Sequence, residues 1–401
     1  MDIKDLFKRL KIEAEIPDDL LEISKRDNLD GSFVEKDFIM SVQKKYDIFC
    51  EEYLELVLKA AEALQNNDEL FFLSKIVVTY MREHTEKSER NAISPLLPEV
   101  LGTPEGDMFY TIIALPLIEG GAETYRARGF SEEEIKNNFK CFNTVIMIGS
   151  WELSRPVSRK MYFFWNMHYL CCTIFDSGVF NFELSHYPKN SVVLKSKANG
   201  DFAIMMVAPR MHKSGYILGS LCHKDEEGSF GPDFLETDTA FTGYLAKDGR
   251  VINKLVTLEK SEWDAVIRPG DPTVSIHIPR KTDLTPEIVE KSLIEGFKKA
   301  KRYYPEHKAS FLTCHSWLLS IELYDHLKDG SKILKFGELF ERYPLESGGR
   351  DCLKFLFPKD CDSLSELEER TSLQTSVKHS FLNGGFIYSA GGILTDKKYY
   401  Q

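Results

Sequence analysis

The sequence has no segment that would cross a membrane or direct export. None of its apolar runs approaches the roughly 18 residues of a membrane span, and the nearest, residues 161–178, is interrupted by Asn166, His168 and Asp176. Residues 1–5 are charged and do not follow the basic, apolar and small-residue order of a signal peptide. We therefore expect a soluble, cytoplasmic protein that does not bind membranes.

Cysteine patterns that hold metals are also missing. The chain contains eight cysteines, none of them in a CxxC pair or at the histidine spacing of a zinc finger. Without an export signal, these thiols should stay reduced. The sequence therefore predicts no metal site and no disulfide framework.

The sequence likewise lacks the short motifs of several enzyme classes. It has neither the GxxxxGK[ST] nor the GxGxxG phosphate loop, and no GxSxG nucleophile motif. The run Cys314-His315-Ser316 suggests a cysteine or serine hydrolase. Neighbouring residues on a strand point to opposite faces, however, which disfavours a nucleophile beside its base. A cysteine or serine hydrolase is therefore the least favoured interpretation of this chain.

Clustered positive charge is scarce. The net charge is −11 and the pI is near 5.5, which argues against a general affinity for nucleic acid. The 401 residues are 43% hydrophobic, enough to bury a large core. A chain of this length more often forms two domains than one.

Residues 1–150 have the pattern of a helical domain. Apolar residues recur at helical spacing over residues 48–64 and 70–81. Ser131 and Glu134 form a capping box, in which each side chain can accept from a backbone N–H of the other residue. We expect a helical N-terminal domain that ends near residue 150.

Residues 151–401 have a mixed pattern. Strands are predicted at residues 179–187 and 201–207, and a hairpin at 241–245 and 251–258 turns at Asp248-Gly249. Helices are predicted at residues 157–172, 317–327 and 371–382, and further strands at 333–340, 352–357 and 386–389. The sequence therefore predicts an α+β protein: a helical N-terminal domain, then a mixed β-sheet domain with flanking helices.

One βαβ unit carries the best functional candidates. Two strands flank an amphipathic helix at residues 285–304, which begins with Thr285 as N-cap and Pro286 in the first turn. The strands are Val274-Ser275-Ile276-His277-Ile278-Pro279 and Ala309-Ser310-Phe311-Leu312-Thr313-Cys314-His315-Ser316-Trp317. A histidine thus lies near the C-terminal end of each strand, where open α/β sheets bind ligands.

These histidines allow a catalytic interpretation. His277 shares one strand face with Ser275, so it could act as a general base, or it could equally be a core histidine with a hydrogen-bonded partner. His315 would supply a second polar group. Ser275, Cys314, Ser316 and Trp317 are the candidate residues of the substrate cleft, although Ser316 could simply be the N-cap of the next helix.

The loop after the first strand is a candidate phosphate site. It leads to a helix N-terminus, where backbone N–H groups and the helix dipole favour an anion, and it carries two adjacent cations. The candidate cofactor-binding residues are Pro279, Arg280, Lys281, Thr282 and Thr285.

The order of elements resembles the GNAT acyltransferase fold. In particular, Ser275-Ile276-His277-Ile278-Pro279 and Thr313-Cys314-His315-Ser316-Trp317-Leu318-Leu319 are similar to segments of a bacterial family that joins a helical N-acyltransferase-associated domain to a GNAT-like C-terminal domain. The resemblance covers nearly the whole chain.

This resemblance implies an enzyme that transfers an acyl group from acyl-CoA or acetyl-CoA to an amine or hydroxyl of a small molecule. His277 lies on the strand that often carries the base in such enzymes, and the 279–285 loop lies where they hold the cofactor pyrophosphate. GNAT enzymes usually have Q/R-x-x-G-x-G/A there, whereas this loop contains no glycine. The alternative is a catalytically inactive GNAT-like binding module.

Overall fold

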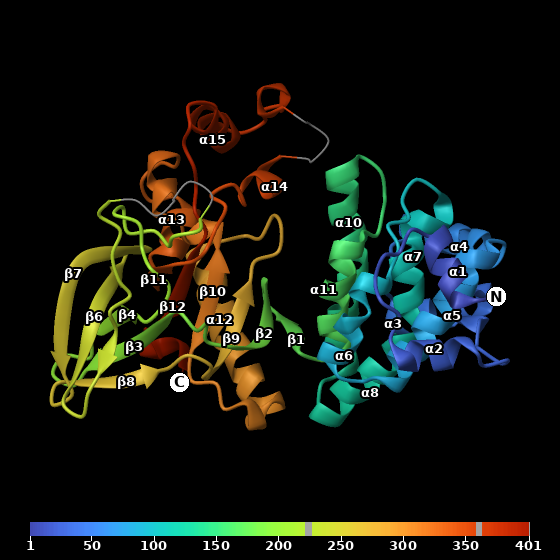
Figure 1. Cartoon of the computed structure of the whole chain (residues 1–401), viewed down its shortest axis with the longest axis horizontal. Helices are drawn as coiled ribbons and strands as arrows, with labels where there is room; N and C mark the ends of the chain where they lie inside the picture. Colours follow the sequence, from blue (N-terminus) through green and yellow to red (C-terminus); the bar gives the residue numbers. More distant parts are fainter. Residues whose placement is uncertain (221–226, 358–362, 401) are drawn as a thin grey trace. The chain divides into compact units, whose positions relative to one another are not determined.

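The computed structural model describes residues 1–220, 227–357 and 363–400. These divide into two compact units, Met1–Phe175 and Asp176–Gln401 (Figure 1). The sequence placed this division near residue 150. The difference arises from α11 (Lys160–Leu170), which buries Phe163, Met167 and Leu170 and contacts helices of the first unit.

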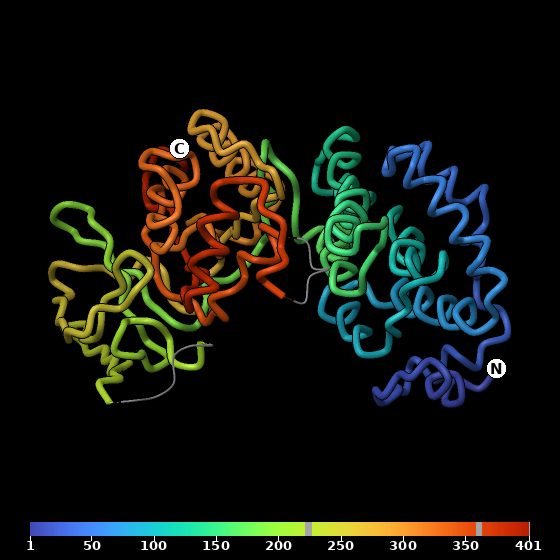
Figure 2. Tube along the Cα trace, turned by 90° about the horizontal axis from the view of Figure 1, so that it is seen from above, coloured from blue at the N-terminus to red at the C-terminus, as the bar shows by residue number. Residues whose placement is uncertain are grey.

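The first unit is helical, as the sequence predicts, and Figure 2 shows its helices in blue to green. The Ser131 capping box is present: Glu134 N donates to Ser131 Oγ (3.3 Å) and Ser131 N donates to Glu134 Oε2 (2.9 Å). Within the described residues, no helix combines the length and apolarity needed to cross a bilayer. Besides α11, the α-helices are α1 (Ile3–Arg9), α2 (Asp18–Ser24), α3 (Lys36–Tyr46), α4 (Glu51–Gln65), α5 (Asp68–Glu83), α6 (Lys87–Ala92), α7 (Pro104–Ala114), α8 (Ile118–Arg128), α9 (Glu132–Phe139) and α10 (Cys141–Leu153).

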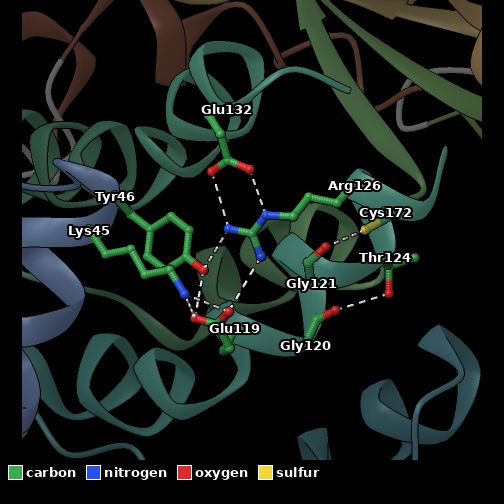
Figure 3. A network of polar contacts seen from close by, with 9 residues as sticks. All are labelled: Lys45, Tyr46, Glu119, Gly120, Gly121, Thr124, Arg126, Glu132 and Cys172. Carbon is green, nitrogen blue, oxygen red and sulfur yellow. Dashed lines mark hydrogen bonds and ion pairs between the residues drawn. The ribbon is translucent and has the colours of Figure 1, made fainter. Parts of the chain in front are cut away.

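A polar network joins three of these helices (Figure 3). Arg126 on α8 donates to both carboxylate oxygens of Glu132 on α9, at 2.6 and 3.1 Å, and to the Tyr46 hydroxyl on α3 at 3.3 Å. Glu119 on α8 accepts from Tyr46 (2.6 Å) and from Lys45 (2.8 Å). Arg126 and Tyr46 each take part in two of these contacts, and the Arg126–Glu132 pair is bidentate. The network therefore fixes α3 and α9 to α8 more firmly than isolated surface ion pairs would.

The second unit contains two six-stranded sheets. The strand order of the first sheet is β1 (Ile174–Ser177), β2 (Phe180–His186), β9 (Pro272–His277), β10 (Leu312–Ser316), β12 (Ala390–Leu394) and β11 (Phe340–Pro344). The second sheet contains β5 (Leu235–Glu236), β6 (Ala240–Lys247), β4 (Phe202–Met206), β3 (Ser191–Ser196) and β8 (Trp263–Ile267), with β7 (Arg250–Glu259) paired to β6. The expected α+β class is confirmed: the first sheet is mixed, with β9 and β10 parallel, whereas the strands of the second sheet pair antiparallel.

Different elements cover the two faces of the first sheet (Figure 1). On one face lies α12 (Pro286–Tyr303), the helix of the predicted βαβ unit, where Gly296 packs against the ring of Phe182. The opposite face packs on the second sheet through an apolar cluster that includes Tyr343 from the first sheet, Tyr187 directly after β2, and Val193, Ile204 and Ile267 from the second sheet. Side chains of β2, β9 and β10 that alternate between faces therefore enter two different environments.

The hairpin and the last helix follow the prediction. Strands β6 and β7 turn at Asp248 and Gly249, whose φ values of 53° and 80° match a two-residue hairpin turn that needs positive φ at both positions. Helix α15 (Ser372–Leu382) begins after Thr371, whose side chain accepts from Gln374 N.

Four predicted elements were wrong. Residues 317–327 form two short 3-10 segments, η5 (Trp317–Leu319) and η6 (Ile321–Asp325), separated by extended Ser320. Residues 333–340 mostly belong to α13 (Lys332–Gly337), which Ser331 caps. Residues 352–357 contain α14 (Leu353–Leu356), and the strand expected at 386–389 begins later, as β12. Short apolar runs fit a strand and a buried helical turn equally well, so periodicity could not separate them.

The contact between α12 and β2 yields a prediction about stability. A Cβ at Gly296 would lie 2.0 Å from the Phe182 ring, so Gly296→Ala should lower the free energy of unfolding by about 1–3 kcal/mol through overpacking. Gly120→Ala in α8 is the matched control, because no atom lies within 4 Å of its added Cβ and alanine favours the helix by up to about 1 kcal/mol. Urea unfolding of both variants measures the difference. Equal stability of the two variants would show that the Phe182 ring moves aside freely.

Candidate active site

The candidate site forms where two parallel strands stop pairing. Strands β9 and β10 pair over only three positions, the last of which is Cys314 with Ile276. Beyond that point His277 still pairs with Asn181 on β2, while His315 still pairs with Gly391 on β12. Each strand therefore follows its outer neighbour and separates from the other at its C-terminal end.

Both histidines lie on the sheet face that packs toward the second sheet. His277 Nε2 is 2.8 Å from Glu183 Oε2, and the two side chains are 33% and 17% exposed. Glu183 faces Ser275 across the antiparallel pair with β2, so Ser275, His277 and Glu183 share this face. A carboxylate only accepts hydrogen bonds, so His277 donates from Nε2 when Glu183 is ionised. The pair can hold an imidazole in one orientation and stabilise its protonated form.

His315 lies in a crowded position that solvent still reaches. Its Nε2 is 2.9 Å from the hydroxyl of Tyr343, and its side chain is exposed although protein atoms surround much of it. Desolvation is the largest of the effects that together lower the pKa of His315 to about 4; the charge of nearby His277 adds to the lowering, and Glu183 opposes it. His315 is therefore neutral near pH 7, with one protonated and one unprotonated ring nitrogen.

The other predicted cleft residues are divided between the two faces. Ser275 is buried on the histidine face, but Cys314 is fully buried on the opposite one, where burial raises the pKa of its thiol to about 12. Ser316 is the N-cap of η5, since its Oγ accepts from Leu318 N at 3.1 Å. Trp317 is buried and stacks on Phe355. The fold thus brings together Ser275, His277 and His315, and it turns Cys314 and Trp317 toward apolar packing.

The loop after β9 forms a tight turn without glycine. Thr282 N donates to Pro279 O at 3.2 Å, and Lys281 has φ 65°, a conformation that usually favours glycine. Thr282 Oγ1 also donates to Pro279 O, at 2.6 Å. Lys281 is exposed and Arg280 is half-buried, where desolvation lowers the pKa of the guanidinium. The turn therefore presents two adjacent cations before α12.

An internal carboxylate already lies at this loop. Asp283 accepts from Thr285 N (3.1 Å) and Thr285 Oγ1 (2.7 Å), and Lys332 Nζ lies 2.9 Å away. The hydrogen bond from Lys332 is the largest of the effects that lower the pKa of Asp283 to about 2. Thr285 keeps its N-cap position without a side-chain capping bond. An anion bound here would share the loop with an ionised Asp283.

Three contributors to the site were missed at the sequence level. Glu183 lay on the polar side of a predicted strand, so its alternation with aromatic residues was a usable signal. Tyr343 and Lys332 had no comparable signal, because Tyr343 lies on β11, which was not predicted, and Lys332 lies on α13, which was predicted as a strand. Among the described residues, no group of three or more histidine, cysteine, aspartate or glutamate side chains is arranged to hold a metal ion.

Comparisons with known proteins agree with this architecture. Residues 174–394 match the family model described as a GNAT-like C-terminal domain. No curated protein sequence matches the chain. Similar solved structures include a mutant acyltransferase in complex with octanoyl-CoA, at 16% identity and TM-score 0.64, and an acyltransferase in complex with decanoyl-CoA and teicoplanin, at 15% identity and TM-score 0.63. Each alignment covers 98% of this chain and 99% of the other. The match over more than half of its residues shows that the chain belongs to the family of proteins with a GNAT-like C-terminal domain.

Proposed function

We propose that the second unit is an acyl-CoA-dependent acyltransferase that acts on an amine or hydroxyl of a small molecule. The observation that carries this proposal is the separation of β9 and β10 beside a histidine held by a carboxylate. A thioester bound at the opening would lie near His277. The cofactor could be acetyl-CoA or a longer acyl-CoA, and we propose a cytoplasmic location, where acyl-CoA is made.

In this proposal His277 is the general base. It removes the proton from the attacking nitrogen or oxygen, while Glu183 orients the ring and stabilises the imidazolium that forms. The nucleophile bonds to the thioester carbon, the carbon–sulfur bond breaks, and the proton can pass from His277 to the departing thiolate. Because attack is direct, no residue need form a covalent intermediate, which agrees with the burial of Cys314.

The cofactor would use the strand edges and the loop. Past Ile276 and Cys314 the facing edges of β9 and β10 no longer pair with each other, so the amides of a pantetheine arm could bond to them as an added strand does. Arg280 and Lys281 would face the pyrophosphate at the start of α12. Solved structures of similar fold contain CoA or acyl-CoA, and some also contain teicoplanin, which supports a thioester and a small-molecule acceptor here rather than nucleic acid or membrane.

A second function is favoured by one specific observation. The loop lacks glycine, and the Asp283 carboxylate already occupies donors near the start of α12. If this prevents cofactor binding, the unit is a GNAT-like binding module in which the histidines only hold the sheet together.

Cofactor binding is the first prediction of this proposal. We expect acyl-CoA to raise the melting temperature of the purified protein, since a ligand at about 100 times its Kd stabilises the native state by about 2.7 kcal/mol. Arg280→Glu should remove most of the shift, whereas Arg302→Glu, an exposed charge reversal at the other end of α12, should keep it. Differential scanning fluorimetry with CoA, acetyl-CoA and longer acyl-CoA species measures both. Absence of any shift would favour the binding module.

The role of His277 gives a prediction about rate. His277→Gln should lower kcat by roughly 100- to 10,000-fold, the usual contribution of a general base, and should leave the acyl-CoA melting shift in place. Glu183→Gln should cause a smaller loss, because the ring keeps a partner but loses a charge. His379→Gln, an exposed histidine on α15, is the control. Full turnover by His277→Gln would refute the assignment.

The reactivity of Cys314 separates the acyltransferase proposal from the hydrolase hypothesis, which requires a reactive thiol. Its thiol is fully buried and its pKa is raised to about 12, so it should resist alkylation by iodoacetamide at pH 7.5 while exposed Cys50 reacts. Peptide mass spectrometry of the native and the urea-unfolded protein measures both residues. Selective labelling of Cys314 in the native protein would instead support a hydrolase with Cys314 as nucleophile.

A further inference from the structure

A row of polar side chains extends the candidate site across three strands. Asn181 on β2 is paired directly with His277 on β9, and β1 lies on the outer side of β2. Asn181 Nδ2 donates to Asp176 Oδ1 on β1 at 2.7 Å. Because residues directly opposite each other in an antiparallel pair point to the same face, Asn181 shares the sheet face of His277 and Glu183. The row therefore runs from Asp176 through Asn181 to the proposed general base.

The hydrogen bond to Asp176 fixes the orientation of the Asn181 amide. An ionised carboxylate can only accept, so the atom that faces Asp176 is Nδ2 and not Oδ1. Oδ1 lies on the other side of the amide and is therefore turned away from β1, toward the side of β9. In the described part of the chain this oxygen makes no hydrogen bond, and the half-buried side chain is still reached by solvent. Asn181 thus presents a hydrogen-bond acceptor beside His277.

The turn between β1 and β2 is anchored on α12, which keeps this pair in place. Val179 N donates to Ser292 Oγ at 3.2 Å. Gly178 has φ 59° and packs so closely on Ser292 that a Cβ there would clash with the serine hydroxyl. Asp176 and Asn181 lie on either side of this turn. The amide is therefore held by secondary structure, which gives the precision that a selective contact requires.

We propose that Asn181 is a specificity-determining residue whose Oδ1 accepts a hydrogen bond from the nucleophile while His277 removes the transferred proton. This inference rests on the proposed acyltransferase function. Directly opposite residues have Cβ atoms about 4.5–5.5 Å apart, so one nucleophilic atom can reach both side chains. Asp176 is a positioning residue, because it acts through Asn181 and not on the substrate.

The two contacts require two hydrogens on the nucleophile. A neutral primary amine carries both: its lone pair bonds to the thioester carbon, one proton passes to His277, and the other stays on the nitrogen, bonded to Asn181 Oδ1, and remains in the amide product. A hydroxyl carries one hydrogen, which His277 takes, so its oxygen would meet Oδ1 with only lone pairs between them. The pair therefore selects an amine over a hydroxyl, a choice that His277 alone leaves open.

The charge around this pair favours the same acceptor. Asp176 contacts Asn181 and Glu183 contacts His277, so two carboxylates lie beside the place proposed for the nucleophile. Alkyl amines are mostly protonated near pH 7, and the carboxylates attract the ammonium form before it loses its proton. An uncharged alcohol gains nothing from them.

Binding of small probes tests the contact without a known acceptor. In the full-length protein labelled with ¹⁵N-asparagine, Asn181→Ala identifies the side-chain amide signal of Asn181. Phenethylamine and phenethyl alcohol differ only in the nucleophilic group. We expect the amine to shift the Asn181 signal at pH 7 and the alcohol to leave it in place, while the signal of exposed Asn253 on β7 moves with neither. No shift with the amine, or equal shifts with both probes, would overturn the proposal.

Turnover then measures the selectivity. With acyl-CoA as donor, mass spectrometry quantifies the amide and the ester formed from the two probes, and the unmodified protein should form the amide at least about tenfold faster. Asn181→Leu should raise KM for the amine about tenfold or more and leave the slower ester formation and the acyl-CoA melting shift unchanged. Asn181→Ala is the second variant if the leucine variant folds poorly, and Asn253→Leu is the matched control. An equal loss of amide and ester formation would reduce Asn181 to a structural role and refute the proposal.

Variants of Asp176 test its positioning role. Asp176→Asn still offers an oxygen to Asn181 Nδ2 and should keep most of the amide-to-ester ratio. Asp176→Leu releases the amide and should lower this ratio about as far as Asn181→Leu does. An unchanged ratio in folded Asp176→Leu would refute the positioning role. If acyl-CoA causes no melting shift, the acyltransferase proposal fails, and the NMR titration still decides whether Asn181 binds the amine.

Discussion

The short parallel ladder between β9 and β10 is the constraint on which the candidate site depends. Each strand pairs with two neighbours. After Ile276 and Cys314, β9 continues to pair with β2 and β10 with β12, so the ends of β9 and β10 separate. The backbone N–H and C=O groups on the facing edges of β9 and β10 do not bond to each other beyond that point. His277 and His315 lie beside these edges on one face of the sheet. A single topological feature thus underlies both the place that we propose for a ligand and the groups proposed to contact it.

The packing of the second sheet links this opening to the interior. It covers the histidine face of the first sheet, and the Tyr187 and Tyr343 hydroxyls are buried in the apolar layer between the sheets. A hydroxyl without a partner there would cost roughly 1–3 kcal/mol. Each of these two has one, since the Tyr187 hydroxyl lies 2.7 Å from Ser191 Oγ and the Tyr343 hydroxyl lies 2.9 Å from His315 Nε2. The contact between Tyr343 and His315 therefore contributes both to the packing of this layer and to the orientation of the histidine.

Much of this arrangement could be predicted from local sequence. The βαβ unit, the caps at Ser131 and Thr285, and the shared face of Ser275 and His277 all follow from periodicity and capping rules, and the structure confirms the helix and both strands. Partners brought by distant segments were beyond local rules. Glu183 lies 94 residues before His277. Tyr343 belongs to β11, a strand that the hydrophobic pattern of the sequence did not predict. The separation of β9 from β10 depends on β12, which was placed several residues too early.

The turn at Lys281 affects how such sites are recognised across proteins. Its backbone occupies the left-handed region with a lysine where glycine is usual. A search by residue letters would pass over this loop, whereas a search by backbone torsion angles would detect it. Divergent chains of this fold, with identities near 15%, should therefore be compared by the path of the main chain at the end of β9 before the absence of a motif is taken as the loss of a site.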